Sequence, residues 1–131
     1  MKRDMELIRE ILLLIEERQH ATSDDLLKVI GETQENADRI AYHLDMLVEE
    51  AGYIKGVAVM GMSNYGHGYM MLELTWSGHE FVDTLRDQTV WEKTRSVANT
   101  AGVTSAKALL DIGKAVVASV IASALKGHGI G

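Results

Sequence analysis

The side chains in this 131-residue chain best suited to metal binding or acid–base chemistry are five histidines, His20, His43, His67, His79 and His128. No two of them have the i, i+4 spacing that lets one helix face hold zinc, and no HExxH motif occurs. The chain contains no cysteine, which excludes disulfides, thiolate metal ligands and thiol catalysis. We therefore expect neither a metal site nor a cofactor.

Sequence motifs of catalysis are also missing. There is no GxSxG nucleophile elbow, no phosphate-binding Gly-Lys-Ser/Thr loop and no GxGxxG after an expected strand. The carboxylates fall on the expected solvent faces of helices, where such residues ordinarily only keep the surface hydrated. We expect a protein that is not an enzyme and that has no small-molecule substrate.

Contact with a macromolecule is the chemistry that residues 31–54, GETQENADRIAYHLDMLVEEAGYI, could support. Apolar residues at every third or fourth position predict a helix with one buried and one exposed face. The helix begins with Gln34, Asn36 and Arg39, and Asn and Gln pair well with adenine in the major groove. These three residues are candidates for DNA contact. Alternatively, they are only the polar first turn of a solvated helix.

The charges near this helix oppose DNA binding. Residues 33–50 contain five acidic residues and one basic residue, Arg39, and there is no Lys or Arg between Lys55 and Arg86. The net charge is −6, whereas affinity for DNA comes largely from cations that neutralise phosphates. We therefore favour contact with a protein, and DNA remains the alternative. The expected partner-contacting residues are Glu35, Asp38, Arg39, Tyr42, Tyr65 and His67.

The elements that must position these residues follow from the pattern of apolar residues and turns. The expected helices cover about 3–19, 24–30, 34–51 and 76–86, and the expected strands cover about 53–60 and 69–75. A loop with three glycines separates the two strands, which indicates a hairpin. The predicted fold class is mainly α with a small β-hairpin, in the order of a winged helix-turn-helix domain followed by C-terminal helices. The expected divisions are 1–86 for this domain, 87–126 for the C-terminal helices and 127–131 for a flexible tail.

Several helix starts can be predicted from capping residues. Thr22 or Ser23 suits the start of the second helix. Two further capping boxes, Ser77 with Glu80 and Thr89 with Glu92, are expected to open the helices that follow the hairpin.

Residues 115–125 of the C-terminal segment are apolar or small on every side of an expected helix. Eleven such residues are too few for a membrane span, which needs about twenty, and Lys107, Asp111 and Lys114 prevent extension of the run towards the N-terminus. A helix that is apolar all round must be buried all round, so we expect a homodimer through the C-terminal helices. Packing of one face on the first helix of the same chain is the alternative, and peripheral membrane attachment is disfavoured because the polar face has few cations. The expected oligomerisation residues are Ala115, Ala118, Ser119, Ala122 and Ser123.

Two family resemblances support the same fold. The segment LTWSGHEFVDTL resembles the Leu-Thr-x-x-Gly signature that closes the wing of bacterial MarR and PadR regulators, with Leu74, Thr75 and Gly78 at the signature positions. Thr75 can cap the next helix, and Gly78 allows its first turn to approach the sheet.

More closely, three segments resemble domain-of-unknown-function family 2513, a group of small bacterial and phage proteins. They are MKRDMELIREILLLIE, YHLDMLVEEAGYI and LTWSGHEFVDTLRDQTVWEKT, and the resemblance covers roughly residues 1–95. It implies a winged-helix fold and a bacterial or phage source, but no activity.

The expected function is that of a non-catalytic regulatory module that acts by protein–protein contact. In a phage setting it could be an acidic inhibitor or adaptor that covers a basic surface of its target. The alternative is a DNA-binding transcriptional regulator of the winged-helix type. Glu6, Glu10, Glu16 and Glu17 interrupt the apolar N-terminal stretch, unlike the core of a signal peptide, so we expect a cytoplasmic protein.

Overall fold

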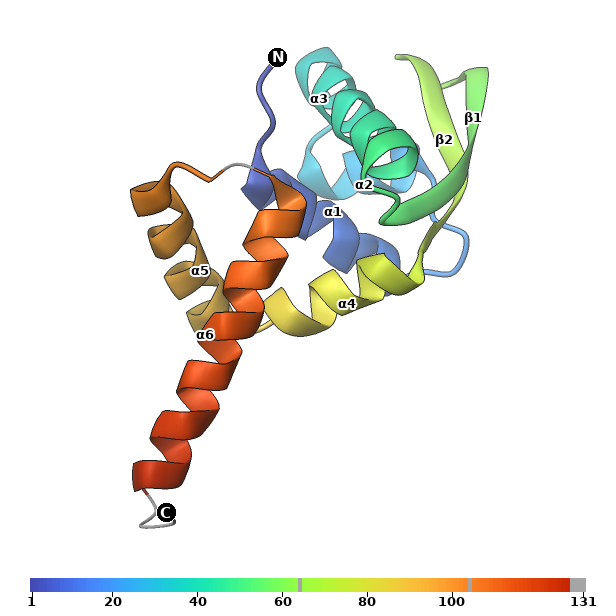
Figure 1. Ribbon diagram of the computed structural model, residues 1–131. Helices are drawn as coiled ribbons and strands as arrows, with labels where there is room; N and C mark the ends of the chain where they lie inside the picture. Colours follow the sequence, from blue (N-terminus) through green and yellow to red (C-terminus); the bar gives the residue numbers. More distant parts are fainter. Residues whose placement is uncertain (64, 104, 128–131) are drawn as a thin grey trace. The chain divides into compact units, whose positions relative to one another are not determined.

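The computed structural model describes residues 1–63, 65–103 and 105–127. The chain forms two compact units, Met1–Val82 and Asp83–Gly131. The described residues form mainly helices together with a two-stranded antiparallel sheet (Figure 1). This confirms the prediction of a mainly helical chain with a small β-hairpin.

The N-terminal unit contains three helices, a hairpin and the start of a fourth helix, in that order. The elements are α1 (Met5–Glu16), α2 (Ser23–Ile30), α3 (Gln34–Asp45), the π-helical turn η1 (Met46–Glu50), β1 (Ile54–Ser63), β2 (Gly66–Leu74) and the first turns of α4 (Trp76–Leu85). The hairpin lies beside α3 in Figure 1, and β2 contacts α1, α2 and α3. The sequence order of these elements agrees with the predicted order.

Side-chain caps explain where the first two helices begin. The Asp4 carboxylate accepts hydrogen bonds from the backbone N–H groups of Glu6 and Leu7 at the start of α1. Thr22 caps α2 through a reciprocal capping box with Asp25. The structure thus selects Thr22 rather than Ser23, because Ser23 is already the first helical residue. Each cap satisfies backbone donors that a helix start leaves without partners.

The predicted third helix, 34–51, does not keep one geometry to its end. After Asp45 it widens into η1, where the N–H of Ala51 donates to the carbonyl of Met46 at 2.9 Å. The N–H of Tyr53 then donates to the carbonyl of Leu47 at 3.0 Å, which leads the chain into β1. Apolar periodicity did not reveal this wider turn, because π-helix is ordinarily a single turn within a longer helix, and η1 covers only five residues.

The sheet is a hairpin with two shifts in strand register, one between Lys55 and Val57 and one between Val59 and Ser63, and with one additional bridge. The first shift is a bulge. Lys55 pairs with Glu73 and Val57 with Met70, so two residues of β2 oppose Gly56. Met71 in this bulge has a φ of 56°, a left-handed value that side chains other than glycine rarely adopt.

The segment before α2 adds one residue to this sheet. The N–H of Leu72 donates to the carbonyl of Ala21 at 2.9 Å, and the two residues form an antiparallel bridge. One edge of β2 is therefore paired with β1 and the other edge, at Leu72, with the chain before α2.

The core of the N-terminal unit contains apolar side chains from every element. The least exposed of these side chains are Ile8, Ile11, Leu12, Leu26, Ile40, Leu44, Leu47, Ile54, Leu72 and Phe81. The helix stripes and alternating strand residues that the sequence predicts thus face one common interior.

Helices α4 and α5 begin earlier than the predicted capping boxes require. Thr75, not Ser77, caps α4, because its hydroxyl oxygen accepts the N–H of Gly78 at 3.2 Å. Asp87, not Thr89, caps α5 (Gln88–Ala101), because its carboxylate accepts the N–H of Val90 at 3.0 Å. Both predicted capping boxes are therefore wrong by two residues, although Thr75 has the capping role that the Leu-Thr-x-x-Gly signature implies.

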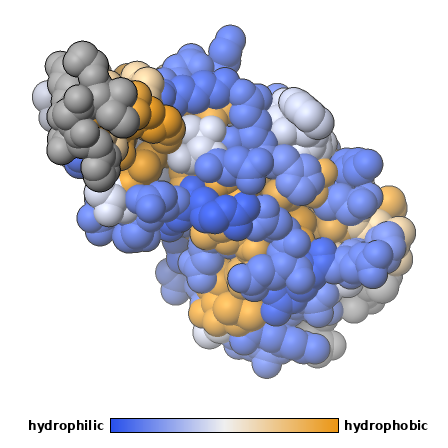
Figure 2. Space-filling view, turned by 90° about the horizontal axis from the view of Figure 1, so that it is seen from below, coloured by the Kyte–Doolittle hydropathy of each residue, from blue (hydrophilic) through white to orange (hydrophobic). Residues whose placement is uncertain are grey.

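The C-terminal unit contains α5 and the longer helix α6 (Ala106–Gly127), which pack against each other. The second half of α6 is largely exposed, with 55% of Ile121 and 47% of Leu125 accessible. Figure 2 shows hydrophobic residues exposed among more numerous hydrophilic ones on the face that it views. The expected burial on every side is thus not provided by the described residues of the C-terminal unit.

The expectation that this segment is too short for a membrane span does not hold for the length and composition of α6. Ala106–Leu125 is long enough and apolar enough to cross a bilayer, with a mean hydropathy of 1.8, and most of this segment is not buried. Length and composition alone are weak support for a span, because core helices of soluble proteins can meet the same criteria.

Candidate functional site on helix α3

The candidate site is the exposed face of α3 together with the hairpin turn beside it. Glu35, Asp38 and Tyr42 are exposed along this face, as the sequence predicts, with 36% of Tyr42 accessible. Their spacing of three and four residues places them on one side of the helix. The structure therefore groups three of the predicted partner-contacting residues on one surface.

Gln34 makes hydrogen bonds within the chain. Its Nε2 donates to the Asp38 carboxylate at 2.8 Å and lies 3.4 Å from the backbone carbonyl of Tyr65. The first bond crosses one turn of α3, and the second connects α3 to the hairpin turn. A DNA base would have to compete with both contacts for this amide.

Asn36 also makes a hydrogen bond within the chain. Its Nδ2 donates to the carbonyl of Gly31 at 3.1 Å, while its backbone N–H donates to the Thr33 hydroxyl. Gly31 has a φ of 135°, so the turn before α3 uses a backbone conformation that favours glycine. Asn36 thus stabilises the turn between α2 and α3.

Arg39 is the single basic residue in positions 33–50, and it forms an ion pair with Asp4. Its Nη2 lies 2.8 Å from the Asp4 carboxylate, with 34% of the Arg39 side chain and 40% of the Asp4 side chain exposed. An ion pair with this exposure contributes about 0–1 kcal/mol. It nonetheless offsets the charge that Arg39 would otherwise present to DNA.

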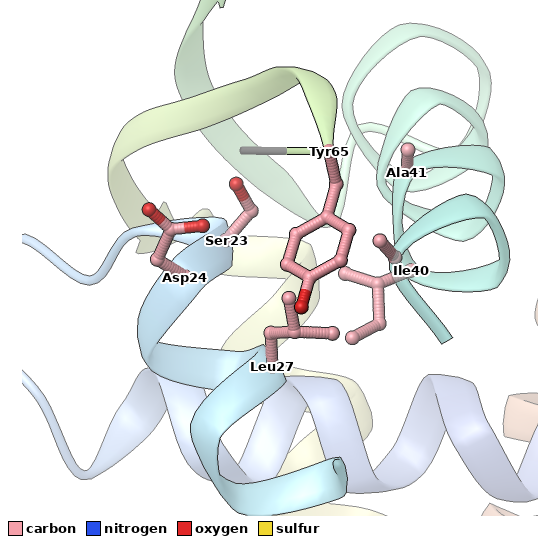
Figure 3. Close-up of a pocket in the computed structure, with 7 residues that line it drawn as sticks. Ser23, Asp24, Leu27, Ile40, Ala41 and Tyr65 are labelled. Carbon is pink, nitrogen blue, oxygen red and sulfur yellow. The ribbon is translucent and has the colours of Figure 1, made fainter. Parts of the chain in front are cut away.

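Tyr65 inserts from the hairpin turn into a small pocket between α2 and α3. Figure 3 shows its ring pointing between the two helices, with Leu27 and Ile40 near its tip. Its hydroxyl donates to the carbonyl of Glu32 at 3.2 Å. The structure thus brings Tyr65 next to α3 as expected, but the ring serves partly to hold the turn in place. The side chain of His67, the other predicted contact in the hairpin, lies outside the described part of the structure.

His43 was not predicted as a site residue, yet it lies at the centre of a polar cluster and is fully buried. Its Nε2 accepts the backbone N–H of Asp4 at 2.8 Å, and its Nδ1 lies 2.6 Å from the carbonyl of Arg39. Burial lowers the pKa of His43 below its ordinary value of 6.5, despite the raising effects of the Arg39 carbonyl and the Asp4 carboxylate. The helical spacing could have revealed its burial, because position 43 falls on the same stripe as Ile40 and Leu44.

Asp45 contributes less to the acidic surface than its sequence position suggests. Its carboxylate accepts a short hydrogen bond from the hydroxyl of Tyr69, which is buried on β2. Burial, together with the nearby Asp45, raises the pKa of the Tyr69 hydroxyl well above its ordinary value. This pair connects α3 to the sheet, and Asp45 is not among the exposed acidic residues.

The exposed charges of this region remain predominantly acidic. Glu32, Glu35, Asp38, Glu49 and Glu50 are exposed along the start of α3, its outer face and η1. Because Arg39 is paired with Asp4, the electrostatic potential at this surface is set mainly by the carboxylates and is negative. Such a surface attracts cationic partners and repels phosphates. Within residues 1–63, 65–103 and 105–127, no cluster of three His, Asp or Glu side chains suits a metal ion.

The predicted oligomerisation residues lie on the exposed part of α6. Ala115, Ala118, Ser119, Ala122 and Ser123 are all exposed in the single chain. A groove between α5 and α6 continues this surface, and it is lined by Lys93, Ser96, Val97, Val116, Ser119 and Val120. A helix could approach α6 closely along these small side chains.

Comparisons with known proteins agree with the closer of the two resemblances. The family model described as "Hypothetical protein (DUF2513)" matches residues 2–104. An uncharacterized protein of Haemophilus influenzae is 28% identical over 123 residues, which cover 93% of this chain and 100% of that protein. An alignment of this extent must reach beyond residue 104 into α6. No solved structure gives a significant match.

Proposed function

The chain belongs to the DUF2513 family, and we propose that it is a non-catalytic regulatory protein that binds a basic protein surface through α3. We further propose that its N-terminal unit is a winged helix-turn-helix domain, with the β1–β2 hairpin as the wing. The order of α1, α2, α3 and the hairpin supports this assignment, as does the bridge from Ala21 to β2.

The single observation that supports protein contact rather than DNA contact is the use of the three candidate base-reading side chains within the chain. Gln34 is hydrogen-bonded to Asp38, Asn36 to Gly31, and Arg39 is paired with Asp4. The side chains exposed around them are acidic. A partner that offers Lys and Arg would meet complementary charge here. The phosphates of DNA would instead be repelled by these carboxylates.

The partner contact can be tested with a photo-crosslinking residue at Tyr42, in the full chain and in cell extract. We expect a discrete cross-linked protein that disappears when Glu35→Lys and Asp38→Lys are combined, because like charges then face each other. Affinity for the purified partner should fall about tenfold or more. Glu10→Lys with Glu17→Lys is the matched control, because it changes the net charge equally at two exposed positions, one in α1 and one at its C-terminal cap. Equal losses for both pairs of substitutions would contradict the proposal.

DNA binding is the second candidate function, favoured by the winged-helix order of elements. It predicts that DNA from upstream of the gene raises the fluorescence anisotropy of the labelled protein at 50 mM salt. The affinity should then fall steeply by 200 mM salt, since counterion release dominates such complexes. We expect no binding at either salt concentration. Binding with a steep salt slope would establish the alternative.

We also propose that the chain forms a homodimer through α6. The exposed apolar surface of its second half supports this, because a dimer would remove that surface from water. Ala122→Arg in the full chain should halve the mass measured by light scattering after size exclusion, since a long cation then enters the close helix contact. Lys107→Glu, an exposed change in the first half of α6, should leave the dimer intact. A monomeric unmodified chain would refute the proposal.

A further inference from the structure

We propose that His43 is a proton-controlled latch that holds the N-terminal segment against α3 when its ring is neutral and releases it when the ring is protonated. The latch joins Asp4, immediately before α1, to α3, two parts of the chain far apart in sequence. It does not depend on the identity of any partner of the α3 surface.

The hydrogen bonds determine which nitrogen of His43 carries the proton. The N–H of Asp4 is a donor and points at Nε2, so Nε2 must be the unprotonated acceptor. The carbonyl of Arg39 can only accept, so Nδ1 must carry the proton and donate to it. Both ring nitrogens thus bind backbone groups, and only the neutral Nδ1–H tautomer satisfies both.

Protonation of Nε2 would break this arrangement. The new N–H would face the N–H of Asp4, and two donors cannot share a hydrogen bond. The ring is fully buried, so water cannot solvate the new charge without local opening. Local opening should occur at the segment Met1–Asp4, because this segment precedes the first helix and is not part of the core.

Release of Asp4 would affect three other contacts. The carboxylate of this residue caps α1 through the N–H groups of Glu6 and Leu7, and it pairs with Arg39 at 2.8 Å. An opened latch therefore weakens the first turn of α1 and frees the guanidinium of Arg39. The acidic surface of α3 would then present a cation that it does not present at neutral pH.

Two charged groups act on the ring from the elements packed around it. The Asp4 carboxylate, on the segment before α1, favours the protonated ring, whereas the Arg39 guanidinium, on α3 itself, opposes it. The aromatic ring of Tyr42, 5.4 Å away in an edge-on arrangement, carries no charge. Burial is the largest influence and favours the neutral ring, so the latch should open below the ordinary titration range of histidine.

NMR of the isotope-labelled full chain tests the latch directly between pH 8 and pH 4.5. At pH 8 the ring nitrogens of His43 should show the Nδ1–H tautomer. On acidification, exchange protection of the Asp4 amide should be lost with the same midpoint as His43 protonation, below pH 6.5. The amide of Leu72, in the core of the sheet, should stay protected through this transition. An Nε2–H tautomer, or protection of Asp4 that does not follow His43, would overturn the proposal.

Two variants are expected to shift the pH midpoint of His43 protonation in opposite directions. They therefore distinguish a latch from a histidine that is only structural. Asp4→Asn keeps a capping side chain and the backbone N–H but removes the carboxylate charge, so the midpoint should move to lower pH. Arg39→Gln removes the opposing cation and keeps the backbone carbonyl, so the midpoint should move to higher pH. Shifts in the same direction, or no shift in either variant, would refute the electrostatic control that the latch requires.

Discussion

Replacement of Gly78 with alanine is expected to lower the free energy of unfolding of the N-terminal unit by about 3 kcal/mol. Gly78 is buried in the first turn of α4, and a Cβ atom there would collide with the backbone carbonyl oxygen of Tyr53. That carbonyl cannot move away easily, because it accepts the N–H of Thr75 at 3.0 Å. The collision is with backbone atoms rather than with a flexible side chain, so the structure cannot relax by a change of rotamer.

Urea unfolding followed by circular dichroism measures this effect. Ser77→Ala is the matched control, since Ser77 is the preceding residue, lies in the same helical turn and is exposed. It should change the stability by less than about 0.5 kcal/mol. A Gly78→Ala chain as stable as the Ser77→Ala chain would show that α4 does not approach the start of β1 as closely as described.

The second large effect is expected at Trp91, where substitution by alanine should lower the free energy of unfolding by about 3–5 kcal/mol. Trp91 is fully buried on α5 and is among the largest buried side chains of the described residues. Its removal would leave a cavity that the surrounding residues can fill only in part. Val97→Ala, on the exposed side of the same helix, provides the control and should change stability by less than about 0.5 kcal/mol.

Tryptophan fluorescence can report this transition because the two tryptophans have opposite environments. Trp76 is 86% exposed, whereas Trp91 is buried. A Trp76→Phe background leaves Trp91 as the only tryptophan, so the red shift of tryptophan emission in urea follows exposure of α5. Trp91→Ala itself is then measured by circular dichroism. An unfolding midpoint unchanged by Trp91→Ala would contradict the burial of this side chain.

Acidification should lower stability through His43. Because the folded state holds the pKa of His43 below 6.5, the folded chain binds fewer protons than the unfolded chain as the pH falls through that value. The stabilising contribution is therefore fully present above pH 6.5 and is lost as the pH falls through the lower, folded-state pKa. This sign follows from burial of the ring, and it is the thermodynamic counterpart of the latch.

Local sequence patterns predicted the elements, because helix stripes, strand alternation and glycine-rich turns act over a few residues. They were less successful at helix starts, where several capping residues compete. Thr75 and Ser77 both suit a cap, and the choice depends on the approach of Gly78 to Tyr53, which is a tertiary contact. The same applies to Asp87 and Thr89, which lie two residues apart.

The polar contacts of the candidate site could not be predicted from local patterns. Arg39 looked exposed because the sequence alone does not show that Asp4 lies beside it. Nor does the sequence alone show that Asp45 lies beside Tyr69, which is on the second strand of the hairpin. Exposed residues such as Glu35 were predicted correctly, because helical spacing alone determines which side they face.

The bridge between Ala21 and Leu72 also has a consequence for the order in which the chain folds. The β1–β2 hairpin and each helix can form from neighbouring residues, and such local steps take microseconds or less. The bridge instead closes a long loop between the chain before α2 and the second strand, and closing this loop costs conformational entropy. The bridge can therefore form only when contacts in the assembled core offset that cost. We expect the Leu72 amide to gain protection with the rate-limiting step of refolding, after the isolated helices have formed.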